Sequence, residues 1–297
     1  MFRLAHISDI HLLPLPSISL KQLISKRIMG YLNWQFDRKN IHNQDMLRTL
    51  LQDIKQKNTN HLAITGDLVN LALPSEFEAA TKWLKQLGEA NEISIVFGNH
   101  DCYVESGYRR ACESWKNYIG DDRSDEIFPF VRYRKNSALI GVNSGVSTPP
   151  FMATGVFDKR QAEHLKKILE TAKQNHKFRI IMIHHPPVEG VTSLTKKLHG
   201  QNIFRSVIEI LGAELILHGH THVNSLNWIE GPERTVPVIG VASASQRPIR
   251  EHNLRAATYN LFDIDRQSEE WHCRYQTFGY HHSFSSVRKI SDQLLLP

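Results

Sequence analysis

Short apolar runs alternate with longer helical patterns in the first three quarters of the chain. Six runs each stop just before polar residues that can bind a metal ion: residues 2–8, 61–65, 93–97, 138–142, 179–183 and 214–217. Such runs are typical of buried strands that feed loops. Helical spacing marks residues 43–57, 74–87, 158–175 and 202–211, with Asn43 and Asp158 in N-cap positions. This alternation predicts a layered α/β fold with a site at the carboxyl ends of the strands.

The pattern changes after residue 222. Strand-like segments at 225–229, 236–241, 257–263 and 270–278 are separated by turns. They predict antiparallel strands that complete a second sheet. A chain of 297 residues with this pattern is expected to form one domain, 1–297, whose β-rich part covers about 223–297.

The segment at about 12–45 differs from its surroundings. Its apolar residues recur at helical spacing: Leu20, Leu23, Ile24, Ile28, Tyr31 and Leu32. Its basic residues are Lys21, Lys26, Arg27, Arg38 and Lys39, which against Asp37 and Asp45 give a net charge of +3. One interpretation is an amphipathic helix that packs against the body. The other is a helix that faces lipid or covers the substrate, because basic amphipathic segments suit anionic lipid surfaces.

Composition and charge exclude only a few classes of partner, site and cellular location. The formal net charge of +6 suits an anionic partner, but many enzymes share it, so nucleic acid is not expected as a partner. Three cysteines without C-x-x-C spacing argue against a disulfide framework and a zinc ribbon. No signal-like or membrane-spanning run is present, so we expect a cytoplasmic protein, with peripheral contact at the inner membrane face through 12–45.

Five motifs carry the candidate chemistry: Asp9-Ile10-His11, Gly66-Asp67, Gly98-Asn99-His100-Asp101, His184-His185-Pro186-Pro187 and Gly219-His220-Thr221-His222. Their carboxylate, imidazole and amide groups suit first-row divalent ions such as Mn, Fe, Co or Zn. Ligands two residues apart on an extended strand end would point to the same face. Each motif alone is weak, but all five in order at predicted strand ends indicate one metal site.

This series of motifs resembles the calcineurin-like metallophosphoesterase family over residues 4–222. The resemblance implies a four-layer α/β/β/α sandwich with a binuclear metal site at the strand C-terminal edge. It implies that one metal is held by Asp9, His11, Asp67 and His222, and the other by Asp67, Asn99, His184 and His220. Asp67 would bridge the two ions, and His184 rather than His185 would be the ligand. The expected cofactors are therefore two divalent ions, with manganese or iron among the choices.

Two such ions, roughly 3.5 to 4 Å apart, can lower the pKa of a shared water and orient the resulting hydroxide for in-line attack. His100 beside Asn99 is the candidate acid for the leaving group, as in the family. Asp101 is a candidate carboxylate that orients an imidazole or a metal ligand. Asn70 stands where phosphoprotein phosphatases of the family have the last Asp of G-D-x-x-D, so an amide would have to orient His100.

The residues of the motifs indicate a class of substrate. HISDIHL, GNHD, HHPP and GHTH most resemble the bacterial cyclic-nucleotide phosphodiesterase branch, which implies a small-molecule phosphodiesterase. The insertion is similar to that of the branch that cleaves the pyrophosphate of UDP-2,3-diacylglucosamine in lipid A synthesis, which is the alternative. A non-catalytic scaffold is disfavoured because no ligand is missing. A nuclease, with Arg247, Arg250 and Arg255 as phosphate contacts, is a third possibility.

Overall fold

The computed structural model describes the chain except residues 24, 121–126, 249–255, 282–284 and 297. The helices are α1 (Leu20–Leu23), α2 (Arg27–Asn33), the π-helix η1 (Trp34–Arg38), α3 (Lys39–Ile41), α4 (Gln44–Gln56), α5 (Pro74–Leu87), the 3-10 helix η2 (Ala90–Glu92), α6 (Glu105–Ser114), α7 (Lys159–Gln174) and α8 (Gln201–Leu211). The strands are β1 (Phe2–Ile7), β2 (His61–Ile64), β3 (Ile93–Ile95), β4 (Phe130–Arg134), β5 (Ser137–Gly141), β6 (Gly155–Val156), β7 (Phe178–Met182), β8 (Leu198–His199), β9 (Leu215–His218), β10 (Ser225–Ile229), β11 (Val236–Gly240), β12 (Thr258–Gln267), β13 (Glu270–His281) and β14 (Ser286–Leu296).

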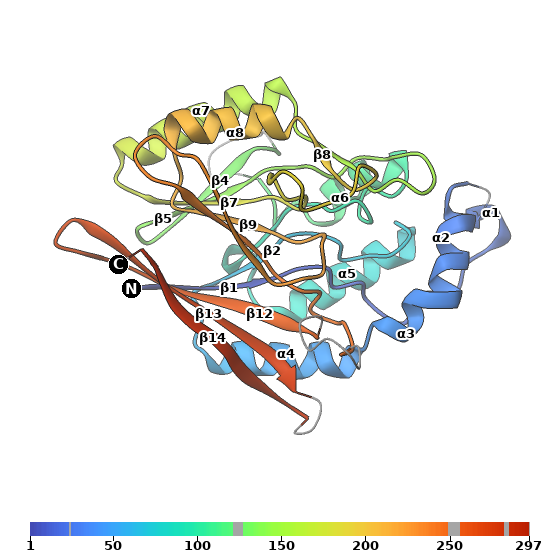
Figure 1. Ribbon diagram of the computed structural model, residues 1–297. Helices are drawn as coiled ribbons and strands as arrows, with labels where there is room; N and C mark the ends of the chain where they lie inside the picture. The colour runs from blue at the N-terminus through green and yellow to red at the C-terminus, as the bar shows by residue number, and fades with distance from the viewer. Residues whose placement is uncertain (24, 121–126, 249–255, 282–284, 297) are drawn as a thin grey trace.

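Two six-stranded sheets form the centre of the molecule. The first has the order β14-β13-β12-β1-β2-β3 and the second β10-β11-β9-β7-β5-β4, while β6 and β8 form a separate pair. Helices α7 and α8 cover the outer side of the second sheet, and α4 and α5 lie on the side of the first (Figure 1). The layers are therefore α/β/β/α, which confirms the predicted fold class.

Alternation along the parallel strands separates two cores. In the segment that includes β7, Ile180 and Met182 pack into the core shared with the first sheet, whereas Ile181 and Ile183 pack into a second core. That second core includes Leu165 of α7, so it fills the space under the outer helices. A strand that is buried on both faces has a continuous apolar sequence, and the run at 179–183 predicted this strand for that reason.

The predicted helices are found at nearly the predicted bounds. The Asn43 side chain caps α4 by accepting hydrogen bonds from the backbone of Asp45 and Met46, and Asp158 caps α7 by accepting one from Gln161. Helix α6 was not predicted. Its sequence ESGYRRACES buries little beyond Ala111 and Cys112, so it carries hardly any apolar periodicity.

The C-terminal part is divided between the two sheets. Strands β10 and β11 extend the second sheet next to β9, and β11 runs parallel to β9. Strands β12, β13 and β14 instead extend the first sheet, where β12 pairs antiparallel with β1. The prediction that the whole tail completes one second sheet is therefore wrong. The periodicity of a sequence indicates where strands lie, but it does not indicate which strands pair with each other. Arg247 is exposed, and Arg250 and Arg255 lie outside the described residues.

The insertion forms short helices that project from one end of the molecule (Figure 1). No residue of α2 is buried, and Ile28 and Leu32 are 49% and 43% exposed. The interpretation of a helix whose apolar stripe packs against the body is wrong for these two residues. Helix α2 is attached through polar groups instead, since Arg27 donates hydrogen bonds to the carbonyls of Leu71 and Ala72. Ile24 lies outside the described residues.

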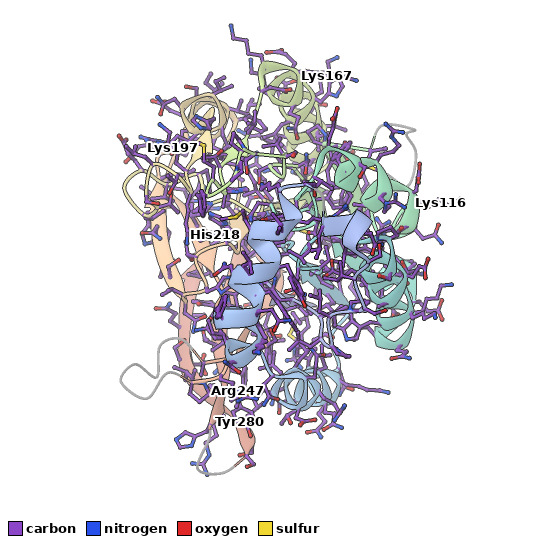
Figure 2. The ribbon with its side chains drawn as sticks, turned by 90° about the vertical axis from the view of Figure 1, so that its right-hand side faces the viewer. Lys116, Lys167, Lys197, His218, Arg247 and Tyr280 are labelled. Atoms are coloured by element: carbon purple, nitrogen blue, oxygen red, sulfur yellow. The ribbon has the colours of Figure 1, made fainter. Side chains whose placement is uncertain are left out.

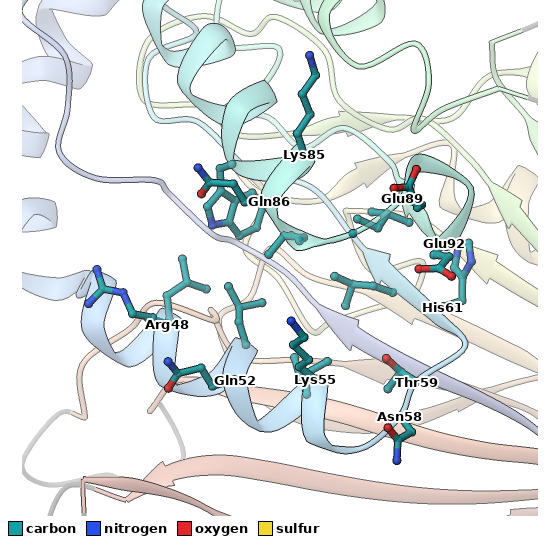
Figure 3. A pocket seen from close by; sticks show the side chains of 18 of the residues that line it. Arg48, Gln52, Lys55, Asn58, Thr59, His61, Lys85, Gln86, Glu89 and Glu92 are labelled. Carbon is teal, nitrogen blue, oxygen red and sulfur yellow. The ribbon is translucent and has the colours of Figure 1, made fainter.

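A groove of about 800 Å³ lies between α4 and α5 (Figure 3). His61 and Ile93, the first residues of β2 and β3, help to line it. It therefore lies at the opposite strand ends from the predicted ligands, and it contains none of them. Within the described part of the chain, no helix has the length and apolar character needed to span a membrane.

Candidate metal centre

The seven predicted ligands lie in five loops, each after the carboxyl end of a strand. Asp9 and His11 follow β1, Asp67 follows β2 and Asn99 follows β3, all in the first sheet. His184 follows β7, and His220 and His222 follow β9, in the second. His222 is half-buried and the other six are buried. The two sheets thus bring both halves of the ligand set to one edge, on the side from which the insertion projects (Figures 1 and 2).

Backbone conformation, rather than strand alternation, makes the ligands converge. Asp9, His11, Asp67, His220 and His222 have φ values of 53°, 44°, 56°, 68° and 54°. These are left-handed conformations that residues other than glycine rarely adopt, and such strain concentrates at functional sites. The prediction that paired ligands share the face of an extended strand is therefore wrong. The pairs lie in turns that begin after β1 and β9 have ended.

Asp67 lies between the two groups of ligands. Its Oδ2 is 3.4 Å from His184 Nε2 and 3.9 Å from His11 Nε2. Asn99 Oδ1 lies 3.3 Å from the same His184 nitrogen. Possible ligand atoms cluster within 4.8 Å in the sets Asp9–His11–His222 and Asp9–Asp67–His184. A carboxylate in this position can serve two metal sites at once.

Hydrogen bonds fix which nitrogen of each imidazole faces the centre. His184 Nδ1 donates to the Thr65 carbonyl at 2.6 Å, and His11 Nδ1 is 3.3 Å from the Val69 carbonyl. The Nε2 atoms of both rings are then directed to Asp67. His220 is reversed, because its Nε2 is 3.0 Å from the Lys196 carbonyl. Backbone carbonyls commonly orient metal-binding histidines in this way.

His185 differs from its neighbour His184. Its Nδ1 lies 2.8 Å from Ser144 Oγ and its Nε2 lies 3.1 Å from the Ala153 carbonyl, so both ring nitrogens have protein partners. Burial and the nearby His220 hold the pKa of His185 well below its usual value. It also groups with His184 and His220 within 4.8 Å. We assign it to the wall of the site, because a ligand needs a nitrogen that is not already engaged.

Charge is balanced within the buried centre. Burial opposes charge on Asp9 and Asp67, but His222 beside Asp9 and His184 beside Asp67 outweigh it and hold both pKa values below their usual range. Burial likewise opposes charge on His184, and Asp67 raises its pKa to about 9. The acidic groups are therefore ready as carboxylates, the form that binds cations.

Asp101 supports the centre through the backbone. Its carboxylate accepts hydrogen bonds from the backbone N–H groups of Asp67 at 2.8 Å, Leu68 at 2.9 Å, Val69 at 3.3 Å and Gly98 at 2.9 Å. It has no hydrogen bond to an imidazole of the described residues, so the predicted role in orienting an imidazole is wrong and the role in positioning a ligand, Asp67, remains. Burial and the charge of Asp67 raise the pKa of Asp101 to about 7.

His100 is oriented by a main-chain group. Its Nδ1 donates to the carbonyl oxygen of Asn70 at 2.6 Å, and its backbone N–H donates to Asp67 Oδ1 at 2.7 Å. The Asn70 side chain points elsewhere and donates to the Leu12 carbonyl at 3.0 Å. The prediction that the Asn70 amide orients His100 is therefore wrong, because the backbone of Asn70 does so whatever its side chain is.

Two groups near the centre were missed from the sequence. His42, at the end of the insertion, lies with its ring 4.6 Å from that of His11 and bonds Ser245 Oγ at 2.7 Å. Ser243 Oγ donates to the Asp9 carbonyl at 2.6 Å. The run Ser243-Ala244-Ser245 after a predicted strand is the sequence signal that could have found the serines.

The family model described as calcineurin-like phosphoesterase matches residues 2–224. The chain belongs to this family. Its membership and its His/Asp cluster support a metal-dependent phosphoester hydrolase.

This calcineurin-like phosphoesterase is similar in fold to solved structures and similar in sequence to one relative. A dimetal phosphatase from Danio rerio is 12% identical with a TM-score of 0.62, over 99% of this chain and 98% of that one. A purple acid phosphatase from yellow lupin (Lupinus luteus) seeds is 9% identical with a TM-score of 0.64, over 99% and 53%. An uncharacterized protein of Acanthamoeba polyphaga mimivirus is 24% identical over 188 residues, 60% of this chain but 13% of the relative. At these identities the structural likeness shows the fold.

The residues present fit a pair of divalent cations. Asp9 Oδ1 is buried and lies 3.0 Å from His222 Nε2, and no described residue donates a well-aligned hydrogen bond to it. Glycine keeps the loops close enough to share ligands, since a side chain at Gly98 would collide with Asp67 Oδ1 and one at Gly219 with Ser8 and Asp9. A buried carboxylate oxygen facing an imidazole nitrogen without a hydrogen bond is the arrangement that a cation would complete.

Proposed function

We propose that this calcineurin-like phosphoesterase hydrolyses a phosphodiester bond in a small molecule. The observation that carries the proposal is the convergence of Asp67, His184 and His100 at one buried edge, with the remaining ligand loops around them. The motif likeness makes cyclic nucleotides the first substrate class to test. We further propose that its metals come from Mn, Fe, Co and Zn, because the ligands are carboxylate, imidazole and amide groups without thiolate.

When bound, the two cations would lower the pKa of the attacking water and offset charge on the phosphoryl oxygens. The protein groups then have separate tasks. As the oxygen of water bonds to phosphorus and the bond to the leaving oxygen breaks, His100 gives that oxygen a proton. Its Nδ1 donates to the Asn70 carbonyl, so Nε2 would be the nitrogen that transfers the proton. Asp101 holds the backbone that carries Asp67 in place.

A second candidate is a pyrophosphate substrate that carries acyl chains, with peripheral contact to membrane lipid. The insertion exposes large apolar side chains at Ile28, Met29, Leu32 and Phe36, which are 49%, 38%, 43% and 82% exposed. Residues 28, 32 and 36 are four apart, so along a helix they would follow one side. An exposed apolar stripe on a basic insertion beside a metal centre suits acyl chains or an anionic lipid surface.

The deciding experiment compares four substrates with the protein loaded in turn with Mn, Fe, Co and Zn. These are bis(p-nitrophenyl) phosphate, cyclic AMP, UDP-2,3-diacylglucosamine and a phosphomonoester. We expect turnover of the generic diester and of cyclic AMP. Faster turnover of the acylated pyrophosphate would favour the second candidate instead. Metal-replete protein that is inactive on all four would overturn the hydrolase proposal.

A further inference from the structure

Lys26, the residue that precedes α2, reaches from the insertion toward the body of the protein. Its Nζ donates to Thr148 Oγ1 at 3.0 Å and lies 4.3 Å from the centre of the Tyr103 ring. Thr148 belongs to the loop after β5, and Tyr103 follows the motif that contains Asn99 and His100. Three segments far apart in the sequence therefore meet at this ammonium group.

The ammonium group lies close to the candidate acid. The Tyr103 ring stacks on the His100 ring, with the centroids 5.7 Å apart and the planes 10° from parallel. The sum of the two ring distances places Nζ within about 10 Å of the His100 imidazole. Lys26 and His100 therefore contact the same tyrosine ring, which places the ammonium group near the residue proposed to serve the leaving oxygen.

The charge of Lys26 has no acidic partner among the residues that the structure describes. Thr148 Oγ1 is its hydrogen-bond acceptor, and Thr148 itself donates to the Met152 carbonyl. Among the described residues, the other two N–H groups of the ammonium have no hydrogen-bond acceptor, so they can bind another ligand. Burial lowers the pKa of Lys26 to about 8, which leaves most of the charge in place at neutral pH. A half-buried cation without a carboxylate is stabilised by any anion that binds to it.

We propose that Lys26 binds an anionic group on the leaving half of the substrate, so that the preferred substrates are pyrophosphate diesters, whose leaving group is itself a phosphate ester. This inference rests on the proposed phosphoesterase function. Between the two candidates above, it favours the second, a pyrophosphate substrate, over cyclic nucleotides. The leaving oxygen of a cyclic nucleotide belongs to its own sugar and carries no second phosphate, whereas that of an acylated nucleotide pyrophosphate does.

The test compares two substrates that differ by one phosphate, a dinucleoside pyrophosphate and the corresponding dinucleoside monophosphate. Lys26→Met removes the charge and keeps an unbranched apolar side chain in the same place. We expect it to raise KM for the pyrophosphate by about 10- to 100-fold, the range for losing a hydrogen bond to a charged group, and to leave the monophosphate unchanged. Lys26→Arg should recover part of the loss.

The control is Lys39→Gln, which removes the same charge from an exposed position where Nζ contacts Gln35. This variant should leave KM unchanged for both substrates. Equal losses on both substrates with Lys26→Met would show that Lys26 only fastens the insertion, and no change on either would show that it does not meet the substrate. Either result overturns the inference.

Calorimetry with a methylene-bridged analogue of the pyrophosphate, which cannot be hydrolysed at the bridge, separates this inference from the proposed function. Lys26→Met should weaken binding of the analogue to metal-loaded protein. If wild-type protein turns over no ester but this weakening is found, the proposed function fails and the role of Lys26 stands. If esters are hydrolysed and the analogue binds both proteins equally, the role of Lys26 fails alone.

Discussion

The motif loops and the insertion are neighbours with opposite physical character. Six of the seven predicted ligands in the loops are buried. The loop backbones are held together, since Asp101 accepts hydrogen bonds from four N–H groups of the loops around Asp67 and Gly98. Helix α2 of the insertion buries no residue and exposes Ile28 and Leu32. Chemistry needs a fixed geometry, while substrate choice can be carried by a segment that few contacts constrain. Substitutions in the two regions should therefore differ in kind.

The largest effect is expected from Asp67→Ala. The change removes the carboxylate that lies between His184 and His11, so both proposed metal sites would lose a ligand. Hydrolysis of bis(p-nitrophenyl) phosphate should fall by at least about a thousandfold, and bound metal should decrease in elemental analysis. Asp45→Ala, on the exposed first turn of α4, is the matched control. Near-normal activity in Asp67→Ala would contradict the assignment of this centre.

The next effect is expected from His100→Ala, which should separate proton transfer from metal binding. We expect kcat to fall by about 10²- to 10⁴-fold, the usual contribution of a general acid, with the metal content unchanged. The loss should be smaller for p-nitrophenyl esters than for alkyl esters, because nitrophenolate leaves without needing a proton. An equal loss for both kinds of ester would count against the acid role.

A smaller effect is expected from Asn70→Ala. The carbonyl that orients His100 is kept in this variant, whereas the side-chain hydrogen bond from Asn70 to the Leu12 carbonyl is lost. We expect kcat to change by less than about tenfold, since one neutral hydrogen bond is worth roughly 1 kcal/mol. A loss as large as that of His100→Ala would show that the side chain itself serves the acid. The variant therefore tests whether the backbone or the side chain of Asn70 orients the His100 imidazole.

Much of the motif region was predictable because each signal was local. An apolar run followed by Asp, Asn or His identified each strand and the polar residue at its carboxyl end, and Asn43 and Asp158 marked where helices begin. Tertiary features were not predictable in this way. The partner of the Asn70 carbonyl, the left-handed turn at Asp9 and the pairing of β12 with β1 depend on contacts between distant segments.

The position of the insertion could not be predicted from its sequence. Its amphipathic spacing gives the same signal whether the apolar stripe faces a core or the solvent. Only the structure shows that Ile28 and Leu32 are exposed, and only it places Lys26 against Tyr103 and Thr148. The function of a segment with few internal constraints must therefore be tested through what it binds.

The smallest effect on the chemistry is expected from the double change Leu32→Ser and Phe36→Ser. Both side chains are exposed, at 43% and 82%, so hydrolysis of bis(p-nitrophenyl) phosphate and the free energy of unfolding in urea should stay near the wild-type values. Co-sedimentation with vesicles of anionic phospholipid should fall by about tenfold or more, because each side chain contributes roughly 1.5 to 3 kcal/mol when it is buried. Trp228→Ser, an exposed apolar residue on β10, should leave vesicle binding unchanged. Loss of turnover on the soluble ester would show instead that the insertion shapes the metal centre, and the contrast between the two regions would no longer hold.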